Sequence, residues 1–202
     1  MGVAASGFNA KDIHGTFIES ARLFALAAED TSLHEAACEA AEMIIACLKN
    51  GGKLLLCGNG GSAADAQHFA GEMVGSFLIK NRAGLAAVAL NADTSVLTCV
   101  GNDRSYDEVF AQQVGALGRA GDVLLGFSTS GNSKNVVRAF ETARSLGMKL
   151  IALTGRGGIL PQMADTAVCV PSDATPRIQE VHALLIHIIC GYVEAEMFKN
   201  EQ

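Results

Sequence analysis

The stretch LLLCGNGGSAAD at residues 54–65 joins an uninterrupted apolar run to a loop of glycine and small polar residues. A short run without a polar position is typical of a strand that is buried on both faces, as in a parallel sheet. The residues that follow the loop, 62–77, suit a helix. This order of strand, small-residue loop and helix predicts an α/β unit.

The same order of apolar run, small residues and helical pattern recurs along the rest of the chain. Further short apolar runs are each followed by Gly or Ser and then by a helical pattern. Alternating strands and helices with right-handed crossovers give an open, doubly wound sheet, so we predict a three-layer α/β/α fold with a parallel sheet. The predicted strands are residues 53–57, 85–90, 122–127, 149–154 and 167–170, and the predicted helices among and after them are 62–77, 106–117, 133–146 and 176–198.

Two helices are predicted ahead of this core. Residues 12–29 carry apolar side chains at helical spacing, and Thr31 and Ser32 suit the cap of a second helix at 33–48. We expect this pair, within residues 11–50, to pack on the core or on another subunit. No boundary suggests a second domain, so residues 1–202 are predicted to form one domain with its α/β core at 53–198.

Composition excludes several classes of protein. The chain has 202 residues and a net charge of −6, half of it is apolar, and 18% is charged. This apolar fraction is too high for intrinsic disorder. An acidic chain without Lys/Arg runs lacks the charge that binds a phosphate backbone, so no nucleic-acid partner is expected. The apolar runs are too short for a membrane-spanning helix, so no membrane partner is expected.

The cysteines indicate a reducing compartment. Six cysteines are scattered without a C-x-x-C motif, and most lie inside apolar runs, which favours buried thiols. The first ten residues have no basic stretch leading into an apolar one, so no signal peptide is expected. The expected location is the cytoplasm.

A second loop repeats the design of the first. Residues 128–133, Ser-Thr-Ser-Gly-Asn-Ser, place four hydroxyls between an apolar run and a predicted helix start. The free N–H groups and the dipole of a helix N-terminus favour an anion, and hydroxyls donate to phosphate oxygens. Such a pocket suits a phosphate monoester. The alternative is that these residues merely form turns and helix caps.

The first loop also fits a dinucleotide fingerprint. Gly58, Gly60 and Ala63 match its alanine variant, and the acidic residue Asp93 follows the next predicted strand. Asp93 lies 30 residues beyond Ala63, however, where about 20 is usual. The polar loop suits a hydroxylated sugar at least as well as a pyrophosphate.

A histidine and a glutamate share one helix face. His68 and Glu72 are four residues apart, so they can bind one Zn²⁺ together or orient each other. On the last predicted helix Gln179 and His187 continue one stripe, whereas His182 lies on another face. Gln179 and His187 are about 12 Å apart along an ideal helix axis, so joint binding of one metal needs extended side chains. The alternative is that these histidines are ordinary core residues.

Asn102 and Asp103 follow a further apolar stretch at 96–100. If that stretch is a strand of a parallel sheet, they lie where ligand-contacting polar groups gather. Arg104 and Arg177 are the nearest cations, and both also suit a solvent-exposed position.

Four motifs occur in order: GNGGS at 58–62, GND at 101–103, STSGNS at 128–133 and RIQEVH at 177–182. With them the chain closely resembles the sugar isomerase (SIS) family, and within it the bacterial enzymes that isomerise sedoheptulose 7-phosphate, from about residue 50 to 198. The resemblance implies conversion of that ketose to D-glycero-D-manno-heptose 7-phosphate through an enediol(ate), which supplies heptose for cell-surface polysaccharide. It also implies a homotetramer whose active sites lie between subunits.

The resemblance implies roles for individual residues. The implied isomerisation needs a carboxylate base and an acid near the oxygens, for which Glu72 and His187 are the candidates. One Zn²⁺ per subunit is implied, with the ligands His68, Glu72, Gln179 and His187. Implied substrate contacts are Asn59, Gly60, Gly61, Ser62, Glu72, Asn102, Asp103, Ser128, Thr129, Ser130, Ser133 and Gln179.

Three alternatives stay open. A relative in the same superfamily is a non-catalytic adaptor that binds a replication initiator, and it lacks the metal-site glutamate and the second histidine. This chain has Glu72 and His187, which favours an enzyme. The chain could instead be an isomerase or a sensing domain for another sugar phosphate, or a dinucleotide enzyme.

Overall fold

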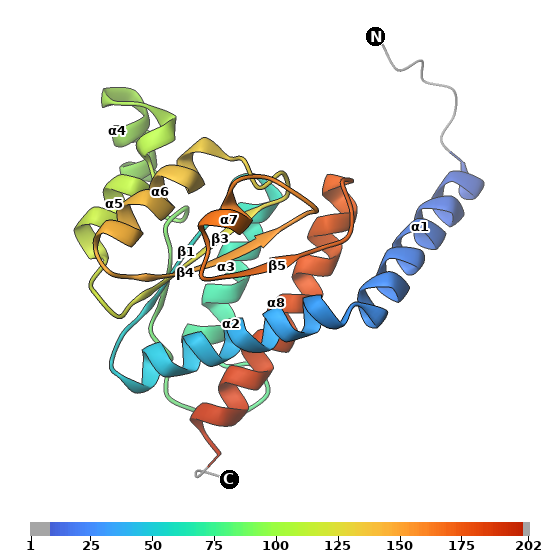
Figure 1. Cartoon of the computed structure of the whole chain (residues 1–202), viewed down its shortest axis with the longest axis horizontal. Helices are drawn as coiled ribbons and strands as arrows, with labels where there is room; N and C mark the ends of the chain where they lie inside the picture. Colours follow the sequence, from blue (N-terminus) through green and yellow to red (C-terminus); the bar gives the residue numbers. More distant parts are fainter. Residues whose placement is uncertain (1–8, 200–202) are drawn as a thin grey trace.

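Five parallel strands make one sheet in the spatial order β2-β1-β3-β4-β5. The computed structural model describes residues 9–199. Within them the prediction of a doubly wound parallel sheet is confirmed, with helices on both faces (Figure 1). The strands are β1 (Leu54–Cys57), β2 (Ala87–Ala89), β3 (Val123–Ser128), β4 (Lys149–Thr154) and β5 (Thr166–Cys169).

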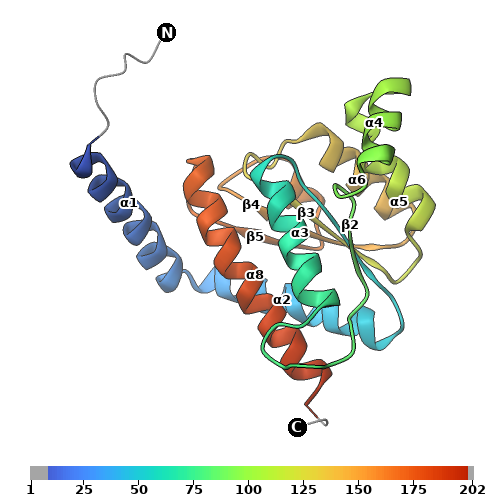
Figure 2. The same cartoon turned by 180° about the vertical axis from the view of Figure 1, so that it is seen from behind.

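The helices form the two outer layers. Helices α2, α3 and α8 cover one face of the sheet, and α5, α6 and α7 cover the other (Figures 1 and 2). The helices are α1 (Ala10–Glu29), α2 (Thr31–Lys49), α3 (Gly61–Val74), α4 (Thr94–Asp103), α5 (Ala111–Leu117), α6 (Lys134–Ser145), α7 (Leu160–Met163) and α8 (Thr175–Met197), with a short 3₁₀ helix η1 (Tyr106–Glu108). The predicted helix at 106–117 is therefore divided into η1 and α5.

The sheet has an apolar cluster on each face because successive strand residues point to opposite sides. Leu54 and Leu56 join the cluster beneath α2, α3 and α8, whereas Leu55 and Cys57 join the cluster beneath α5 and α6. All four side chains are fully buried. Burial on both faces explains why the strand runs contain no polar position.

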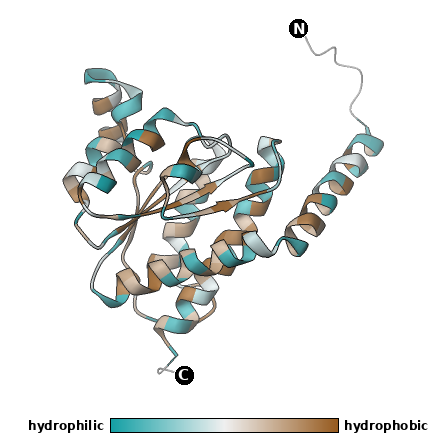
Figure 3. Ribbon diagram, viewed as in Figure 1, coloured by the Kyte–Doolittle hydropathy of each residue, from teal (hydrophilic) through white to brown (hydrophobic). Residues whose placement is uncertain are grey.

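Helix α1 extends away from the rest of the molecule (Figure 1). Only Leu23 and Ala27 of this helix are buried, while the apolar Phe17 is 71% exposed. Brown and teal residues alternate along α1 in Figure 3, and its apolar residues Ile13 and Leu26 are also exposed. The predicted pair of N-terminal helices is present. Helix α2 packs on the core along its length, whereas α1 contributes only Leu23 and Ala27 to the buried core.

Asp30 caps α2, so the predicted cap at Thr31 and Ser32 was wrong by one residue. The Asp30 carboxylate accepts a hydrogen bond from the Leu33 N–H at 3.1 Å. An aspartate accepts from the free N–H groups at a helix start as well as serine or threonine does.

The apolar stretch at 96–100, considered above as a possible strand, belongs instead to α4. The Asp93 carboxylate caps this helix by accepting from the Val96 N–H at 3.0 Å. Val96, Leu97 and Val100 then share the face that packs on the second apolar cluster. Asp93 is therefore a helix cap, which removes the acidic residue of the dinucleotide fingerprint.

None of the helices within residues 9–199 is both long enough and apolar enough to span a membrane. The expectation about the first ten residues falls largely on residues 1–8, which lie outside the described part of the chain.

Candidate active site

The two small-residue loops lie side by side at one edge of the sheet. Strands β1 and β3 are neighbours, with Cys57 opposite Gly126, and each loop follows the carboxyl end of its strand. Chain order reverses here, because β2 lies on the other side of β1 from β3. Ligands of doubly wound sheets bind in the crevice at such a switch point.

Both loops lead into helix N-termini that carry no capping side chain. Gly60 at the start of α3 has no side chain, and Ser133 at the start of α6 makes no capping bond. The Ser133 hydroxyl lies instead 2.9 Å from the hydroxyl of the buried Ser128. The Ser133 hydroxyl thus does not occupy the N–H groups that begin α6, and the exposed Ser130 accepts a hydrogen bond from the Asn132 N–H at 3.2 Å just before this helix. This arrangement suits an anion.

Two asparagines join the loops. The Asn59 amide donates to Asn135 on α6, and the Asn135 amide donates back to Asn59, both at 2.8 Å. The Tyr106 hydroxyl donates to Asn59 at 3.3 Å. The Asn59 side chain therefore fixes the spacing of the loops, a role that the sequence did not reveal for either Asn59 or Asn135.

The other predicted loop residues are held as follows. Ser62 is buried in the first turn of α3. The Thr129 hydroxyl lies 3.3 Å from that of Thr175 at the start of α8. Gly60 has a φ of +57°, a conformation that glycine adopts without strain.

Three side chains converge where α3 and α8 run side by side (Figure 2). The Nε2 atoms of His68 and His187 are 3.2 Å apart, and His68 Nε2 is 3.2 Å from Glu72 Oε1. All three ligand atoms lie within 4.8 Å of one another. The i,i+4 spacing on α3 brings His68 and Glu72 together, and the tertiary fold adds His187.

The donor set fits a zinc ion. Two ligand atoms of a tetrahedral Zn²⁺ with bonds of about 2.0–2.1 Å are about 3.3–3.4 Å apart. The two closest separations in the cluster are both 3.2 Å. Imidazole and carboxylate are also the usual ligands of a catalytic zinc ion, which keeps one position open.

Gln179 lies apart from these three side chains. A Cβ atom on Gly61 would lie 2.6 Å from both amide atoms of Gln179, so this amide covers the first turn of α3. Gly61 and His68 are about 10 Å apart along the helix axis. Within one chain Gln179 therefore belongs to the first loop, and its part in metal binding stays a prediction.

Two ionisable groups near the site have shifted pKa values. Burial raises the pKa of Asp65 to about 6, against an opposing effect of His68, and its Oδ2 atom is buried without a partner. Burial lowers the pKa of His182 to about 4, although a bond to the Thr154 carbonyl opposes this. His182 is fully buried on the core-facing side of α8, so its exclusion from the cluster is confirmed.

Asn102 and Asp103 end α4 rather than a strand. The Asn102 amide donates to Asp103 at 2.7 Å, and both residues are exposed. Of the two candidate cations, Arg104 donates to Gln112, and Arg177 donates to the Thr16 carbonyl on α1. The structure of a single chain does not bring these four residues to the His68–Glu72–His187 cluster, and the substrate contacts of Asn102 and Asp103 stay predictions.

No sequence pattern indicated a role for Phe77 in the site. Its ring stacks on the His187 imidazole with centroids 5.4 Å apart and an interplanar angle of 12°. Phe77 was the last residue of the helix predicted at 62–77, but α3 ends at Val74. Only the fold reveals the contact of Phe77 with His187.

Comparison with known proteins agrees with this geometry. The SIS domain family matches residues 6–155. The chain is 55% identical over 164 residues to a phosphoheptose isomerase of Helicobacter pylori, which covers 81% of this chain and 85% of that protein. The structure of phosphoheptose isomerase GmhA from Neisseria gonorrhoeae superposes with a TM-score of 0.86 at 51% identity, covering 92% of this chain and 98% of that one. A phosphoheptose isomerase from Francisella tularensis gives a TM-score of 0.88 at 40% identity, covering 93% and 98%. The chain therefore belongs to the phosphoheptose isomerase family of SIS-domain proteins.

Proposed function

We propose that this aldose–ketose isomerase converts sedoheptulose 7-phosphate to D-glycero-D-manno-heptose 7-phosphate. The observation that carries the proposal is the convergence of His68, Glu72 and His187 beside a hydroxyl-lined loop in a chain of this family. The adaptor alternative is not favoured, because relatives that share more than half of the sequence are named as isomerases.

The reaction moves one carbon-bound proton. A base takes it from C1 of the ketose, an enediol(ate) forms, and a proton is delivered to C2. The oxygens exchange a proton in the opposite sense. The chemistry therefore needs a carboxylate base, an acid near the oxygens and stabilisation of the developing oxyanion.

We assign the base to Glu72 and the acid to His187. Glu72 directs Oε1 at His68, so its second carboxylate oxygen is left to take the proton. His187 is exposed and lies on the neighbouring helix, from which it can donate to a substrate oxygen. This division lets one carboxylate contact the metal site and still act as a base.

His68, Glu72 and His187 would hold the zinc ion, one per chain. When bound, zinc supplies a Lewis acid that polarises the sugar carbonyl. In this proposal Gln179 contacts the sugar from the first loop, and Asn59, Gly60, Gly61 and Ser62 shape that loop.

The second loop would bind the phosphate. Ser128, Thr129, Ser130 and Ser133 supply hydroxyls, and the start of α6 supplies N–H groups. A bound phosphate anchors a flexible seven-carbon chain and aligns its carbonyl end with Glu72, which lowers the entropic cost of reaction.

The assembly proposed for this chain is a homotetramer. An apolar cavity of about 510 Å³ lies between α1, α2 and α8 and is lined by Phe24, Leu184 and Ile188 among others. Leu184 and Ile188 are 43% and 51% exposed, and α1 stands away from the body. A second copy of the chain would cover these side chains.

Sedimentation equilibrium should give a mass of four chains, and Ile188→Asp should dissociate this assembly.

We also place the enzyme in the cytoplasm, where it would supply heptose for cell-surface polysaccharide. All six cysteines are unpaired, as expected of a reducing compartment.

The decisive experiment is incubation with sedoheptulose 7-phosphate in D₂O, followed by NMR. The aldose 7-phosphate should form with solvent deuterium at C2. Ribulose 5-phosphate and fructose 6-phosphate serve as comparison substrates. No product from the heptulose, or faster conversion of a shorter sugar, would contradict the proposed substrate.

A further inference from the structure

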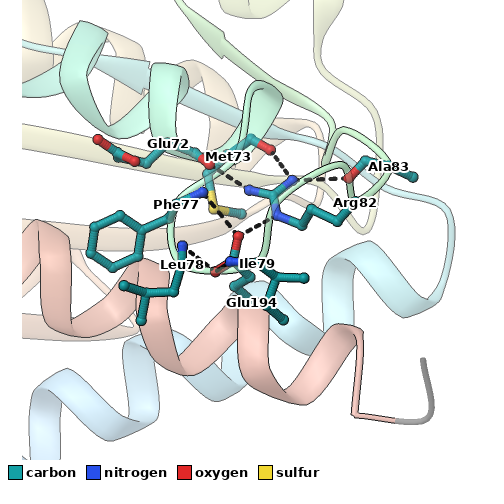
Figure 4. A network of polar contacts seen from close by, with 8 residues as sticks. All are labelled: Glu72, Met73, Phe77, Leu78, Ile79, Arg82, Ala83 and Glu194. Carbon is teal, nitrogen blue, oxygen red and sulfur yellow. Dashed lines mark hydrogen bonds and ion pairs between the residues drawn. The ribbon is translucent and has the colours of Figure 1, made fainter. Parts of the chain in front are cut away.

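A buried ion pair lies beneath the candidate active site. Arg82 and Glu194 contact each other with side chains that are 1% and 2% exposed (Figure 4). Removing both charges from water is costly, so a buried pair is weak evidence for stability alone. Its other contacts indicate what the pair does.

Glu194, on α8, shapes the segment that follows α3. Its carboxylate accepts from the backbone N–H groups of Phe77, Leu78 and Ile79 at 3.0, 2.7 and 2.9 Å. Burial raises the pKa of Glu194, but the bonds from Arg82 and these N–H groups lower it overall. Three successive backbone groups are thus tied to one ionised carboxylate.

Arg82 holds the end of α3. Its guanidinium donates to the backbone carbonyls of Glu72 at 2.5 Å and Met73 at 2.9 Å, and to Ala83 at 2.9 Å. The last carbonyls of a helix have no partner within the helix, so a buried arginine can satisfy them. Arg82 therefore fixes the backbone of Glu72 itself.

Phe77 links the ion-pair network to His187. Its N–H is held by Glu194, and its ring lies on the Glu72 side of the network (Figure 4). The ring stacks on the His187 imidazole at 5.4 Å between centroids. An offset stack of this kind restricts the plane of the imidazole, and His187 Nε2 then faces His68 Nε2 at 3.2 Å.

We propose that Glu194, Arg82 and Phe77 are positioning residues for the His68–Glu72–His187 cluster. The ion pair folds residues 75–83, Arg82 fixes the Glu72 backbone, and Phe77 sets the orientation of the His187 ring. This inference rests on the proposed function for the role of the cluster, but the contacts that define it do not depend on the substrate.

The test compares Phe77→Leu with two controls. Phe77→Tyr keeps the aromatic ring, and Lys80→Ala changes an exposed side chain of the same segment. Zinc affinity is measured by competition with a chromophoric chelator. In metal-free protein, the rate at which diethyl pyrocarbonate modifies His187 is measured by peptide mass spectrometry. A further variant, Glu194→Gln, removes the negative charge of the ion pair. Its stability is measured by urea unfolding.

Phe77→Leu should weaken zinc binding about tenfold, as losing an outer contact of a metal ligand does. His187 should react faster, and kcat should fall while KM for the sugar phosphate stays near that of the wild type. Phe77→Tyr should restore zinc affinity to within about twofold of the wild type, and Lys80→Ala should match it as closely.

Unchanged zinc affinity and unchanged His187 reactivity in Phe77→Leu would overturn the proposal, whatever happens to stability. If Glu194→Gln does not fold, Phe77→Leu still tests the positioning role, because this variant leaves the Arg82–Glu194 ion pair intact. A wild-type protein without isomerase activity would refute the proposed function instead, and the His187 modification rate would still test the positioning role.

Discussion

Replacing Gly131 with alanine should displace the phosphate loop. Gly131 has a φ of +65°, a conformation that costs an L-residue about 1–2 kcal/mol. Its added Cβ would overlap the carbonyl oxygen of Gly157 and lie 3.0 Å from the Cα of Gly158. Both neighbours are backbone atoms that cannot rotate away. The loop must therefore move by roughly 1 Å to restore ordinary contact distances.

This movement would shift the hydroxyls that flank Gly131. Ser130 and Ser133 supply the proposed phosphate contacts, and misplacement by about 1 Å can cost up to about 10²-fold in rate. We expect kcat/KM for sedoheptulose 7-phosphate to fall about 10- to 100-fold, mainly through KM, because phosphate binding is remote from the reacting carbons. The strained φ alone should lower the free energy of unfolding by about 1–2 kcal/mol.

Gly157→Ala is the matched control. Its added Cβ meets nothing within 4 Å, although Gly157 lies on the loop that contacts Gly131. Steady-state kinetics and urea unfolding of both variants separate displacement of the loop from a general effect of an added methyl group. Equal KM values for the two variants would refute the reasoning.

Four further predictions concern the cluster, the phosphate loop and the core. Glu72→Gln should lower kcat by about 10³-fold or more with an unchanged circular dichroism spectrum, and near-normal turnover would exclude the base role. Ser130→Ala should raise KM and leave kcat nearly unchanged, so an unaltered KM in steady-state assays would contradict the phosphate assignment. Elemental analysis should find about one zinc per chain, and chelation should abolish activity that Zn²⁺ restores, whereas full activity without metal would refute the zinc proposal. Burial lowers the pKa of His182 to about 4, so the unfolded chain binds the extra proton between pH 6.5 and 4, and about 3 kcal/mol of stability is lost as pH falls through that range. Urea unfolding at pH 7.5 and 4.5 should show this loss to be smaller in His182→Leu, and an equal loss would contradict it.

Local sequence patterns predicted those elements whose structure depends on a single property, such as burial on both faces. The strands could be recognised because burial on both faces leaves no polar position, as in Leu54 to Cys57. The apolar stretch at 96–100 was ambiguous, since a short run suits either a strand or a buried helix face. Asp93 decides in favour of the helix by capping it, and the same residue had supplied the acidic residue of the dinucleotide fingerprint.

The site was only partly predictable, because local spacing reveals only contacts between residues that are close in the sequence. His68 and Glu72 share a helix, so their proximity follows from spacing, and the resemblance to the SIS family added His187. The supporting contacts join distant parts of the chain. Glu194 meets residues 115 to 117 positions earlier, and Asn135 meets Asn59 across 76 positions. No periodicity records such pairs, because each is selected by the tertiary fold.

The supports of the site form two separate groups. At the loop end, the Asn59–Asn135 pair and the contact of Gly131 with Gly157 hold the proposed phosphate site. At the other end, residues 75–83 hold the proposed reacting groups. Helix α3 spans both ends, with Gln179 against Gly61 and His187 against His68. A rigid helix keeps the two ends a fixed distance apart. A substitution among the supports of the phosphate site should therefore alter substrate binding, and a substitution among the supports of the reacting groups should alter turnover, each without disturbing the other end.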